Sequence, residues 1–372
     1  HCVSVGETNA AQPLIEHYLN LGHAVLVTNT TKTGQARAKS LFLKPPYTDL
    51  FQAVFLPADQ VGLIVDFYRK YQPKLLILVE TELWPNLIDQ AVEFKIPCIL
   101  INARLSEKSA IGYGKVRVLT THMLQGLNKL LAQDEATLTR YVALGMMAQK
   151  MQVVGNIKFD IQAPTQFVQQ AQQLKQDWAL SGRKIVTLAS THAPEEQQLL
   201  HALQIDLQQN PALLCVVVPR HPERFDDVFQ SIQALNLKVQ RRSLGQSIQA
   251  DTQVYLADSM GELWLWYALS HVCYVGGSLN EPGGGHNILE PIALHVPTVI
   301  GQNYFNFQTI VDEFVAEDAI FVAKNATQAV QQLMQCLAQP EQTQLLNLNA
   351  QKVLARNQGA LQKHIQAIGR YL

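Results

Sequence analysis

Short apolar runs rich in β-branched residues alternate with longer stretches of helical period along almost the whole chain. Segments such as 59–71 and 112–126 carry the helical pattern. The predicted strands are 1–5, 23–30, 74–80, 97–103, 129–134, 151–155, 184–190, 213–219, 252–258, 272–277, 297–301 and 319–323. Strands that alternate with helices form parallel sheets with helices on both faces. The chain is therefore predicted to be an α/β protein.

The alternation pauses once, over 159–182, a glutamine-rich stretch with no strand pattern. A chain of 372 residues is too long for one ordinary hydrophobic core. We predict two Rossmann-like, doubly wound domains at 1–160 and 183–340, a linker at 161–182, and final helices at 341–372 that pack back on the N-terminal domain. Open parallel sheets bind ligands at the carboxyl ends of their strands, so two such domains facing each other would define a cleft.

Composition and charge exclude several classes of protein. No window approaches the roughly 18 consecutive apolar residues that crossing a bilayer requires. The net charge of −1 disfavours nucleic acid as a partner. The five cysteines are scattered and lie mostly in apolar runs, which predicts reduced core residues of a cytoplasmic protein. Because residue 1 is His1 and 1–5 has the pattern of a strand already under way, we expect a longer natural chain upstream.

Common nucleotide and metal motifs are missing from the sequence. There is no P-loop. The Gly-x-Gly at 112–114 follows no predicted strand and has Arg117 where a dinucleotide fingerprint needs its third glycine. No Asp-x-Asp pair is present, and the carboxylates of Glu80 and Glu82 alone do not make a cation site. We therefore expect neither a metal nor a cofactor.

Small or polar residues follow the strands of the second half, where each strand ends and a helix is expected to begin. They are Ser190, Thr191, His192, Pro219, Arg220, His221, Met260, Gly261, Glu262, Gly276 and Gly277. Helix N-termini offer unpaired N–H groups and a partial positive charge, which favour phosphate. Taken alone, each motif is better explained by helix capping or turn geometry. Their shared position at strand ends favours a phosphate-binding site.

A glycine-rich loop within 272–294 separates a predicted buried strand from a helix. Glycines let the backbone approach a ligand closely. Asn287 and Glu290, three residues apart, project from one face of the helix that follows. A carboxylate is suited to accept hydrogen bonds from the hydroxyl groups of a ribose. The loop is therefore predicted to hold the sugar and phosphate of a nucleotide.

Two further candidates each have an ordinary structural alternative. Arg220 and His221 carry groups that can hydrogen-bond a base, but Arg220 is equally explained as a surface residue paired with Glu223 or Glu262. Glu7 follows the first predicted strand, where a buried carboxylate suits a general base. The alternative is an acidic residue in the first turn of a helix, favoured by the helix dipole. Neither signal alone decides a function.

Taken together, the motifs resemble the Kdo (3-deoxy-D-manno-oct-2-ulosonic acid) transferases of lipopolysaccharide synthesis, which are inverting glycosyltransferases of the GT-B fold. The matching stretches are 3–7, 33–34, 80–86, 102–106, 155–160, 190–192, 218–225, 258–263, 275–279, 284–287, 289–291 and 305–307. They occur in the family's order and span nearly the whole chain.

The resemblance implies metal-independent transfer of Kdo from CMP-Kdo to a lipid A precursor at the cytoplasmic face of the inner membrane. It implies Glu7 as the catalytic base. In the second domain it places Arg220 and His221 against the cytidine, Met260 and Gly261 against the phosphate, and Asn287 and Glu290 at the ribose. On the acceptor side it places Gly34, Glu80, Glu82 and Arg104.

The sequence departs from the family pattern at two places. The loop 280–286 is one residue longer than usual, and Ile288 stands where proline is common. The family's N-terminal membrane-anchoring helix is not part of this sequence, so membrane attachment is implied by the resemblance only. Two alternative functions are a sugar-nucleotide 2-epimerase on the same fold and a non-catalytic two-domain sugar-binding protein. The motifs 3–7 and 80–86 favour the transferase over both.

Overall fold

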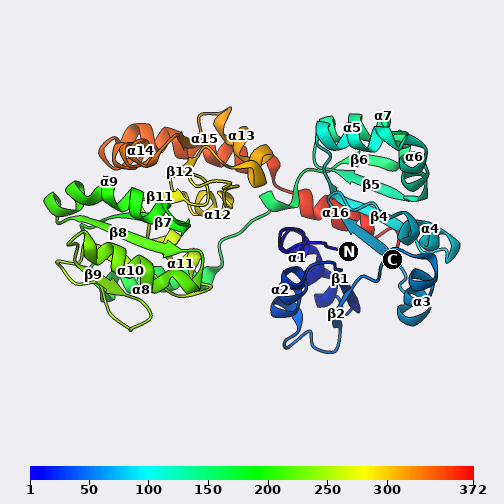
Figure 1. Cartoon of the computed structure of the whole chain (residues 1–372), viewed down its shortest axis with the longest axis horizontal. Coiled ribbons are helices and arrows are strands. Elements are labelled where there is room, and N and C mark those ends of the chain that lie inside the picture. The colour runs from blue at the N-terminus through cyan, green and yellow to red at the C-terminus, as the bar shows by residue number, and fades with distance from the viewer. The chain divides into compact units, whose positions relative to one another are not determined.

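Parallel strands with helices packed on them form both units into which the chain divides (Figure 1). The computed structural model describes residues 1–372. The first unit comprises His1–Asp160 and Asn357–Leu372, and the second comprises Ile161–Arg356. All strand pairs in both units are parallel, which confirms the predicted α/β class.

The first unit contains a two-stranded sheet, β1-β2, and a four-stranded sheet in the order β3-β4-β5-β6. The strands are β1 (Val25–Asn29), β2 (Phe51–Phe55), β3 (Leu76–Val79), β4 (Cys98–Ala103), β5 (Lys129–Ala132) and β6 (Met151–Val153). The helices are α1 (Val5–Asn20), α2 (Lys32–Phe42), α3 (Val61–Tyr71), α4 (Pro85–Glu93), α5 (Glu107–Lys115), α6 (Arg117–Gly126), α7 (Glu135–Ala143) and α16 (Ala360–Ile368).

Strand β4 shows how the first unit builds its core. Cys98 and Leu100 face a cluster that includes side chains of α3, α4, α6 and α7. Ile99 and Ile101 face the other side, where α1, α2 and α16 contribute. Because both faces are covered, every residue of β4 is buried, and all of them except Asn102 are apolar.

The final helix α16 belongs to the first unit through specific polar contacts. The Asp160 carboxylate accepts hydrogen bonds from the backbone N–H groups of Gly359 and Leu361, at the start of the helix. His364 is fully buried, and its Nε2 accepts a bond of 3.0 Å from the Asn102 N–H. Burial lowers the pKa of His364 to about 4, so its imidazole is neutral at physiological pH.

The second unit contains one seven-stranded sheet in the order β13-β12-β11-β7-β8-β10-β9. The strands are β7 (Lys184–Thr191), β8 (Leu213–Pro219), β9 (Val239–Arg241), β10 (Val254–Leu256), β11 (Val272–Val275), β12 (Thr298–Gly301) and β13 (Phe321–Ala323). The helices are α8 (Thr165–Asp177), α9 (Glu195–Gln209), α10 (Phe225–Ala234), α11 (Leu263–Leu269), α12 (Leu289–Ala293), α13 (Gln308–Val315), α14 (Ala326–Ala338) and α15 (Pro340–Asn357).

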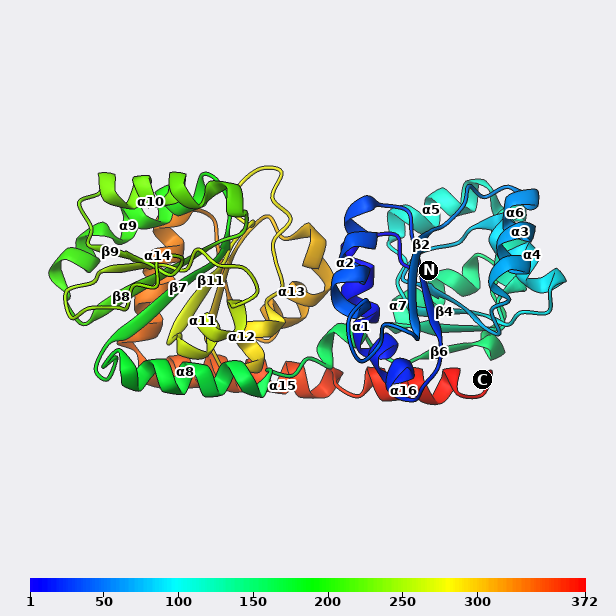
Figure 2. The same ribbon diagram turned by 90° about the horizontal axis from the view of Figure 1, so that it is seen from below.

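Helices cover both faces of this sheet (Figure 2), with α9, α10 and α14 in one apolar cluster and α8 and α11 in the other. Strand order reverses beside β7: the chain proceeds from β7 to β8, β9 and β10 on one side, then to β11, β12 and β13 on the other. In doubly wound sheets the ligand lies at such a reversal, beyond the carboxyl ends of the strands. The end of β7 and its neighbours is therefore the place to look for a site.

The local structure differs from the sequence prediction at four places. Residues 1–3 form no strand, and helix α1 begins at Val5 because the Ser4 hydroxyl caps it. Strands β2 and β9 were not predicted, since each is short and lacks a fully apolar run. The stretch 161–182, expected as a linker, includes helix α8, which packs against α11. The exact domain limits stay a prediction.

None of the helices combines the length and the apolar character that a membrane-spanning segment needs.

Candidate active site

The first unit places Glu7 in the opening turn of α1. Its carboxylate accepts hydrogen bonds from the Val3 N–H at 2.6 Å and from the Ser4 hydroxyl at 3.1 Å, while the Glu7 N–H donates to the Ser4 hydroxyl at 3.3 Å. These reciprocal bonds resemble a capping box, except that the Glu7 carboxylate reaches the N–H of Val3 and not that of the N-cap residue Ser4. The helix-turn alternative is therefore correct as a description of where Glu7 lies.

The surroundings of Glu7 also raise the pKa of its carboxyl group. Burial of the half-buried carboxyl, with the negative charges of Glu82 and Glu80 nearby, raises its pKa to about 7, although the bond from Val3 opposes the shift. A carboxyl with a pKa near the working pH is suited to general base catalysis. The raised pKa favours Glu7 as the general base, and that role stays a prediction.

Glu80 lies at the end of β3, buried between two cations. Its oxygens accept from Arg104 Nε at 2.7 Å and from Lys158 Nζ at 2.9 Å. Burial alone would raise the pKa of Glu80, but Lys158 and Arg104 outweigh it and hold the pKa below the ordinary value. Glu80 is thus an ionised anchor that fixes Arg104 and Lys158, and Lys158 was not predicted as a site residue.

We expect Lys158→Met to lower the free energy of unfolding by about 3 kcal/mol, because the buried Glu80 carboxylate then keeps one cation only. Urea denaturation measures this. The contribution exists above the ordinary carboxyl pKa and is lost as the pH falls through the depressed pKa. Lys238→Met is the matched control, since its pair with Asp251 is exposed and should contribute little to stability. Equal losses in both variants would contradict the burial argument.

Glu82 and Gly34 complete the predicted residues of the first unit. The half-buried Glu82 accepts a bond of 2.8 Å from Trp84 Nε1, and burial raises its pKa. Gly34 lies in the first turn of α2, where a Cβ atom would come within 3.1 Å of the Val3 carbonyl oxygen and 2.8 Å of Thr31 Oγ1. The absence of a side chain at Gly34 therefore lets α2 pack against the segment that holds Glu7.

The predicted residues of the second unit gather at the carboxyl end of its sheet. Eleven of them lie at the carboxyl ends of the adjacent strands β11, β7, β8 and β10 or just beyond: Ser190, Thr191, His192, Pro219, Arg220, His221, Met260, Gly261, Glu262, Gly276 and Gly277. Strand order reverses between β7 and β11, which both end there. The structure thus brings them together where doubly wound sheets bind ligands.

Three histidines, His192, His221 and His286, lie together at this carboxyl end of the sheet. The Nε2 atoms of His192 and His286 lie 2.8 Å apart, so one ring donates a hydrogen bond and the other accepts it. The ring of His221 meets that of His192 edge-on, at 4.9 Å between centroids. Burial, reinforced by the neighbouring cationic or ionisable groups His192, Arg220 and His221, lowers the pKa of His286 to about 3. His286 was not among the predicted site residues, although its motif was recognised.

We expect His286 to stay neutral through the whole physiological range and to take a proton only as the pH approaches about 3. A free imidazole titrates near 6.5. Nuclear magnetic resonance of the ring nitrogens measures the titration directly. A transition near the free value would show that the pair with His192 is not maintained.

The glycine-rich loop is held by a carboxylate that the sequence did not single out. Glu195 is fully buried and accepts hydrogen bonds from the backbone N–H groups of Gly277, Ser278 and Leu279, at 2.7, 2.9 and 2.8 Å. It also accepts from the Tyr274 hydroxyl at 2.7 Å and from the His192 N–H at 3.0 Å. The loop amides are therefore satisfied inside the protein, and Glu195 ties the end of β11 to the end of β7.

Two glycines of this loop, Gly276 and Gly277, allow close packing. The Gly276 N–H donates to the Ala189 carbonyl at 2.8 Å, and a Cβ atom at Gly276 would lie 2.6 Å from the Thr191 Cα. Gly277 has a φ of +69°, and a Cβ there would lie 2.9 Å from the His286 ring. Glycine is required at both positions because the strand ends and the histidine pair approach so closely.

The other loops carry one free cation and several fixed carboxylates. Arg220 is exposed and forms no ion pair. The two carboxylates that the sequence offered as its partners pair with other residues: Glu262 with Arg242 at 2.6 Å, and Glu223 with His221 at 3.6 Å. Glu262 also accepts from the Ser259 hydroxyl, and its bonds with Arg242 lower its pKa. Glu262 therefore shapes the loop at Met260 and Gly261.

Asn287 and Glu290 lie on one face, as predicted, with Asn287 Nδ2 donating to Glu290 Oε1 at 3.2 Å. The buried Glu196 accepts two hydrogen bonds from Arg224, at 2.7 and 3.1 Å, and so fixes the loop that follows β8.

The Thr191 hydroxyl is buried without a hydrogen-bond partner. A buried hydroxyl without a partner is uncommon in folded proteins.

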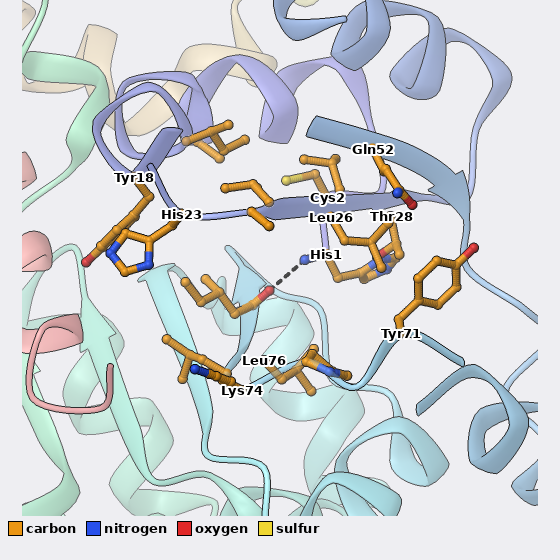
Figure 3. A pocket seen from close by; sticks show the side chains of 18 of the residues that line it. His1, Cys2, Tyr18, His23, Leu26, Thr28, Gln52, Tyr71, Lys74 and Leu76 are labelled. Carbon is orange, nitrogen blue, oxygen red and sulfur yellow. Dashed lines mark hydrogen bonds between the residues drawn. The ribbon is translucent and has the colours of Figure 1, made fainter. Parts of the chain in front are cut away.

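A separate cavity of about 620 Å³ lies in the first unit between β1 and β3 (Figure 3). It is lined mainly by apolar side chains such as Leu14, Leu26 and Leu76. β1 pairs only with β2 and β3 only with β4, so the free edges of both strands border the cavity. None of the predicted site residues lines it, and it is not the candidate active site.

The two Rossmann-like units define the chain as a protein of the GT-B glycosyltransferase fold. A solved glycosyltransferase from Rickettsia africae matches it with a TM-score of 0.61 and 14% identity, over 99% of this chain and 95% of that one. At that identity the match shows the fold alone.

The family follows from closer relatives. Residues 1–161 match the family model described as 3-deoxy-D-manno-octulosonic-acid transferase (kdotransferase). The 3-deoxy-D-manno-octulosonic acid transferase of Haemophilus influenzae is 36% identical over 100% of this chain and 86% of its own length. The solved C-terminal CMP-Kdo binding domain of WaaA from Acinetobacter baumannii is 64% identical, with a TM-score of 0.51, over 51% of this chain and 99% of that domain. The chain belongs to the Kdo transferase family.

Proposed function

We propose that the chain transfers Kdo from CMP-Kdo to a glucosamine hydroxyl of a lipid A precursor. The transfer is a single displacement that inverts the configuration at the anomeric carbon of Kdo. Membership of the Kdo transferase family supplies the reaction class and the sugar. The closely similar domain from Acinetobacter baumannii, described as binding CMP-Kdo, supports the donor. The observation that carries the mechanism is Glu7, a half-buried carboxylate with a pKa raised to about 7.

In the proposed reaction Glu7 acts as the general base. Its carboxylate takes the proton of the acceptor hydroxyl as the oxygen forms a bond to the anomeric carbon of Kdo. The bond from that carbon to the phosphate oxygen breaks, and its electron pair leaves with CMP. Glu7 later releases the proton to water. The pKa near 7 makes proton uptake and release comparably easy at neutral pH.

The second unit is proposed to bind the donor. The free guanidinium of Arg220, with His221, is assigned to the cytidine. Met260 and Gly261 are assigned to the phosphate, because their backbone N–H groups donate no hydrogen bond within the chain. Asn287 and Glu290 are assigned to the ribose hydroxyls. Donors fixed in place before the reaction stabilise charge on the departing phosphate at no cost of reorganisation.

The remaining predicted residues support these contacts. Thr191 offers its unpaired hydroxyl to the donor, and His192 is its neutral neighbour. Ser190, Pro219, Gly276, Gly277 and Glu262 shape the donor loops. On the acceptor side, Glu82 and the Glu80–Arg104 pair are assigned to the sugar, and Gly34 to the packing around Glu7.

The proposed acceptor is a membrane lipid, so we place the reaction at the cytoplasmic face of the inner membrane. Incubation with CMP-Kdo and lipid A precursor, followed by mass spectrometry of the lipid, tests the function. A lipid heavier by Kdo units is expected. An altered sugar nucleotide formed without lipid would indicate the epimerase instead, and binding of free sugar without turnover would indicate a sugar-binding protein.

Metal independence is part of the proposal, because the positive ends of helices and fixed backbone donors supply the charge that a divalent ion provides in other transferases. Transfer by protein treated with a chelator such as EDTA is therefore expected to match that of untreated protein. Loss of activity that added magnesium restores would refute this point.

A further inference from the structure

The first two residues of the chain bridge the cavity that lies between β1 and β3 (Figure 3). The His1 nitrogen donates a hydrogen bond to the Ile77 carbonyl of β3 at 2.6 Å, and the Cys2 N–H donates to the Thr28 carbonyl of β1 at 2.9 Å. Consecutive residues of a strand bond to neighbours on opposite sides when that strand lies between two parallel strands. His1 and Cys2 thus have the bonding of strand residues, although two residues are too few to form a strand.

The backbones of β1 and β3 turn further hydrogen-bonding groups towards the cavity. The Val25 N–H of β1 donates to the residue that precedes β2, so the groups of Leu26 and Thr28 point the opposite way. The Leu76 N–H of β3 donates to the residue that precedes β4, so the groups of Ile77 point away from β4. Backbone N–H and C=O groups inside a protein are nearly always paired. The cavity is therefore suited to a polypeptide backbone and not to an apolar ligand.

Apolar side chains cover the cavity on both faces of the sheet. Helix α1 contributes Leu14 and Ile15, which belong to the apolar cluster on one face. Helix α3 contributes Phe67 and Tyr68, which belong to the cluster on the other face. A strand that is covered on both faces is rich in Val, Ile and Leu. The occupant that fits this cavity is therefore an apolar strand.

We infer that this cavity is the slot for a central strand, formed by the residues directly upstream of His1, and that this strand holds Glu7 in place. The occupant is a segment of the natural chain, because His1 and Cys2 already fix the direction in which the strand runs and the two strands with which it pairs. The strand joins the two sheets of the first unit into one. The role of Glu7 as a base rests on the proposed function, whereas the strand itself does not.

The bonds of His1 and Cys2 determine the register of the inferred strand. The residue directly before His1 donates to the Leu26 carbonyl and accepts from the Thr28 N–H, one pair of positions back from the bond that Cys2 makes. The residue before that one accepts from the Ile77 N–H in the same way. The lining of the cavity extends back to His23 on the β1 side, so about four upstream residues fit into it at about 3.3 Å per residue.

The inferred strand leads directly into the turn that holds Glu7. The Cys2 carbonyl accepts from Asn29 Nδ2 at 2.6 Å, and the Val3 carbonyl accepts from the Thr31 hydroxyl at 2.9 Å. Val3 in turn donates its N–H to the Glu7 carboxylate. A strand fixed between β1 and β3 therefore fixes the position of Val3, and through Val3 the orientation of the proposed base.

Strand order reverses at the inferred strand. The chain proceeds from it to β1 and β2 on one side, and then to β3, β4, β5 and β6 on the other. Ligands of open parallel sheets lie beyond the carboxyl end of the strands at such a reversal. Glu7 follows this carboxyl end by way of the Ser4 cap, so the strand puts Glu7 where the first unit is expected to bind its ligand.

Hydrogen exchange tests the strand in a chain extended by about ten of its natural upstream residues, which is more than the slot holds at about 3.3 Å per residue. We expect the N–H groups of Leu26, Thr28 and Ile77 to exchange at least about a hundredfold more slowly than in the 372-residue chain. The N–H groups of β8 in the second unit are the control and should exchange alike in both chains. Equal exchange at Leu26, Thr28 and Ile77 in the two chains overturns the inference.

Proline substitution in the extended chain tests the register without the shorter chain. A proline in place of the residue directly before His1 removes the N–H that donates to Leu26, and should lower the urea midpoint by about 1 M. A proline in place of the first residue of the extension, beyond the slot, is the matched control and should leave the midpoint unchanged. Equal midpoints in the two variants contradict the inference. Two or more charged residues among the roughly four directly before His1 contradict it too, because both faces of the strand are covered.

Transfer assays separate this inference from the proposed function. The proline directly before His1 should lower kcat at least about tenfold and move the acidic limb of kcat/KM from about 7 towards 4.5, because Val3 no longer holds Glu7 in its buried position. An unchanged limb with a lowered midpoint overturns the part that concerns Glu7. Slow exchange at Leu26 without any transfer from CMP-Kdo supports the strand and refutes the proposed function. Slow exchange in the 372-residue chain that appears only as it self-associates identifies a second copy as the occupant and overturns the inference.

Discussion

Glu7→Gln is expected to lower kcat by about 10²–10⁴-fold while the affinity for CMP-Kdo stays close to wild type. The amide has the shape of the carboxylate but accepts no proton at neutral pH. Its oxygen can still accept from the Val3 N–H, and the Ser4 hydroxyl stays within reach. Because the donor is assigned to the second unit, its affinity should not respond. Single-turnover rates and calorimetric titration with the donor measure the two quantities.

The pH profile gives an independent signature of the same group. A base must be ionised, so kcat/KM of the wild type should fall as the pH drops below about 7, the raised pKa of Glu7. Glu7→Gln should lose this acidic limb while its residual activity stays low at every pH. A midpoint near the ordinary carboxyl value of 4.5 would mean that the burial of Glu7 does not persist in the working enzyme.

Unfolding cannot account for the expected loss, because the stability effect has the opposite sign. Between the ordinary carboxyl pKa of 4.5 and the raised value of about 7, folded Glu7 keeps a proton that the unfolded chain has released. The fold therefore loses stability as the pH rises through this window. The neutral amide removes that penalty, so Glu7→Gln should be at least as stable as wild type above pH 7.

Glu16→Gln is the matched control, because Glu16 lies on the same helix and accepts only from Gln12 Nε2 at 2.9 Å. It should keep wild-type turnover and the acidic limb. Full activity in Glu7→Gln, or an equal loss in Glu16→Gln, would remove Glu7 from the role of general base.

The fold was predictable where burial on both faces leaves a continuous apolar run. β8 is such a strand, and so is β4 apart from Asn102; every residue of both is buried, and both were predicted from the sequence. β2 and β9 did not, because β2 mixes buried and exposed residues and β9 is three residues of intermediate burial. Residues 1–3 have apolar character without a strand, since the Ser4 cap starts a helix immediately after them.

The candidate site was predictable where a residue's neighbours lie close in the sequence. The set of hydrogen bonds that holds Glu7 is local, from Val3 to Glu7, and so are Asn287 and Glu290. Contacts between distant segments were not predictable, because only the folded sheet brings their strand ends together. The pair of Lys158 with Glu80 spans 78 positions, and that of His192 with His286 spans 94. Glu195 looked like an ordinary first-turn acid, and its role depends on amides 82 to 84 positions away.

Glu195→Gln is expected to weaken binding of CMP-Kdo at least about tenfold, although Glu195 is not proposed to touch the donor. One carboxylate oxygen accepts from Ser278, Leu279 and Tyr274, and the other from Gly277 and His192. An amide replaces one acceptor with a donor, so at least two buried N–H or O–H groups lose their partner. Each such loss costs about 1–3 kcal/mol.

The expected route of this effect is displacement of the loop that follows β11. Without the shared carboxylate, Gly277 and His192 are no longer tied together, and the contact of Gly277 with His286 loosens. Donor-site geometry should therefore degrade while the base in the first unit is untouched. We expect KM for CMP-Kdo to rise, the acidic limb near pH 7 to remain, and circular dichroism at the assay temperature to show a folded protein.

Glu223→Gln provides the comparison for Glu195→Gln, since Glu223 is an exposed carboxylate near the same loops and pairs only loosely with His221. Its donor affinity should equal that of wild type. A folded Glu195→Gln protein with unchanged donor affinity would mean that the loop amides hold their geometry without the carboxylate. A rise in KM accompanied by a shifted acidic limb would mean that the substitution also changes Glu7, which would contradict a route through the donor loop alone.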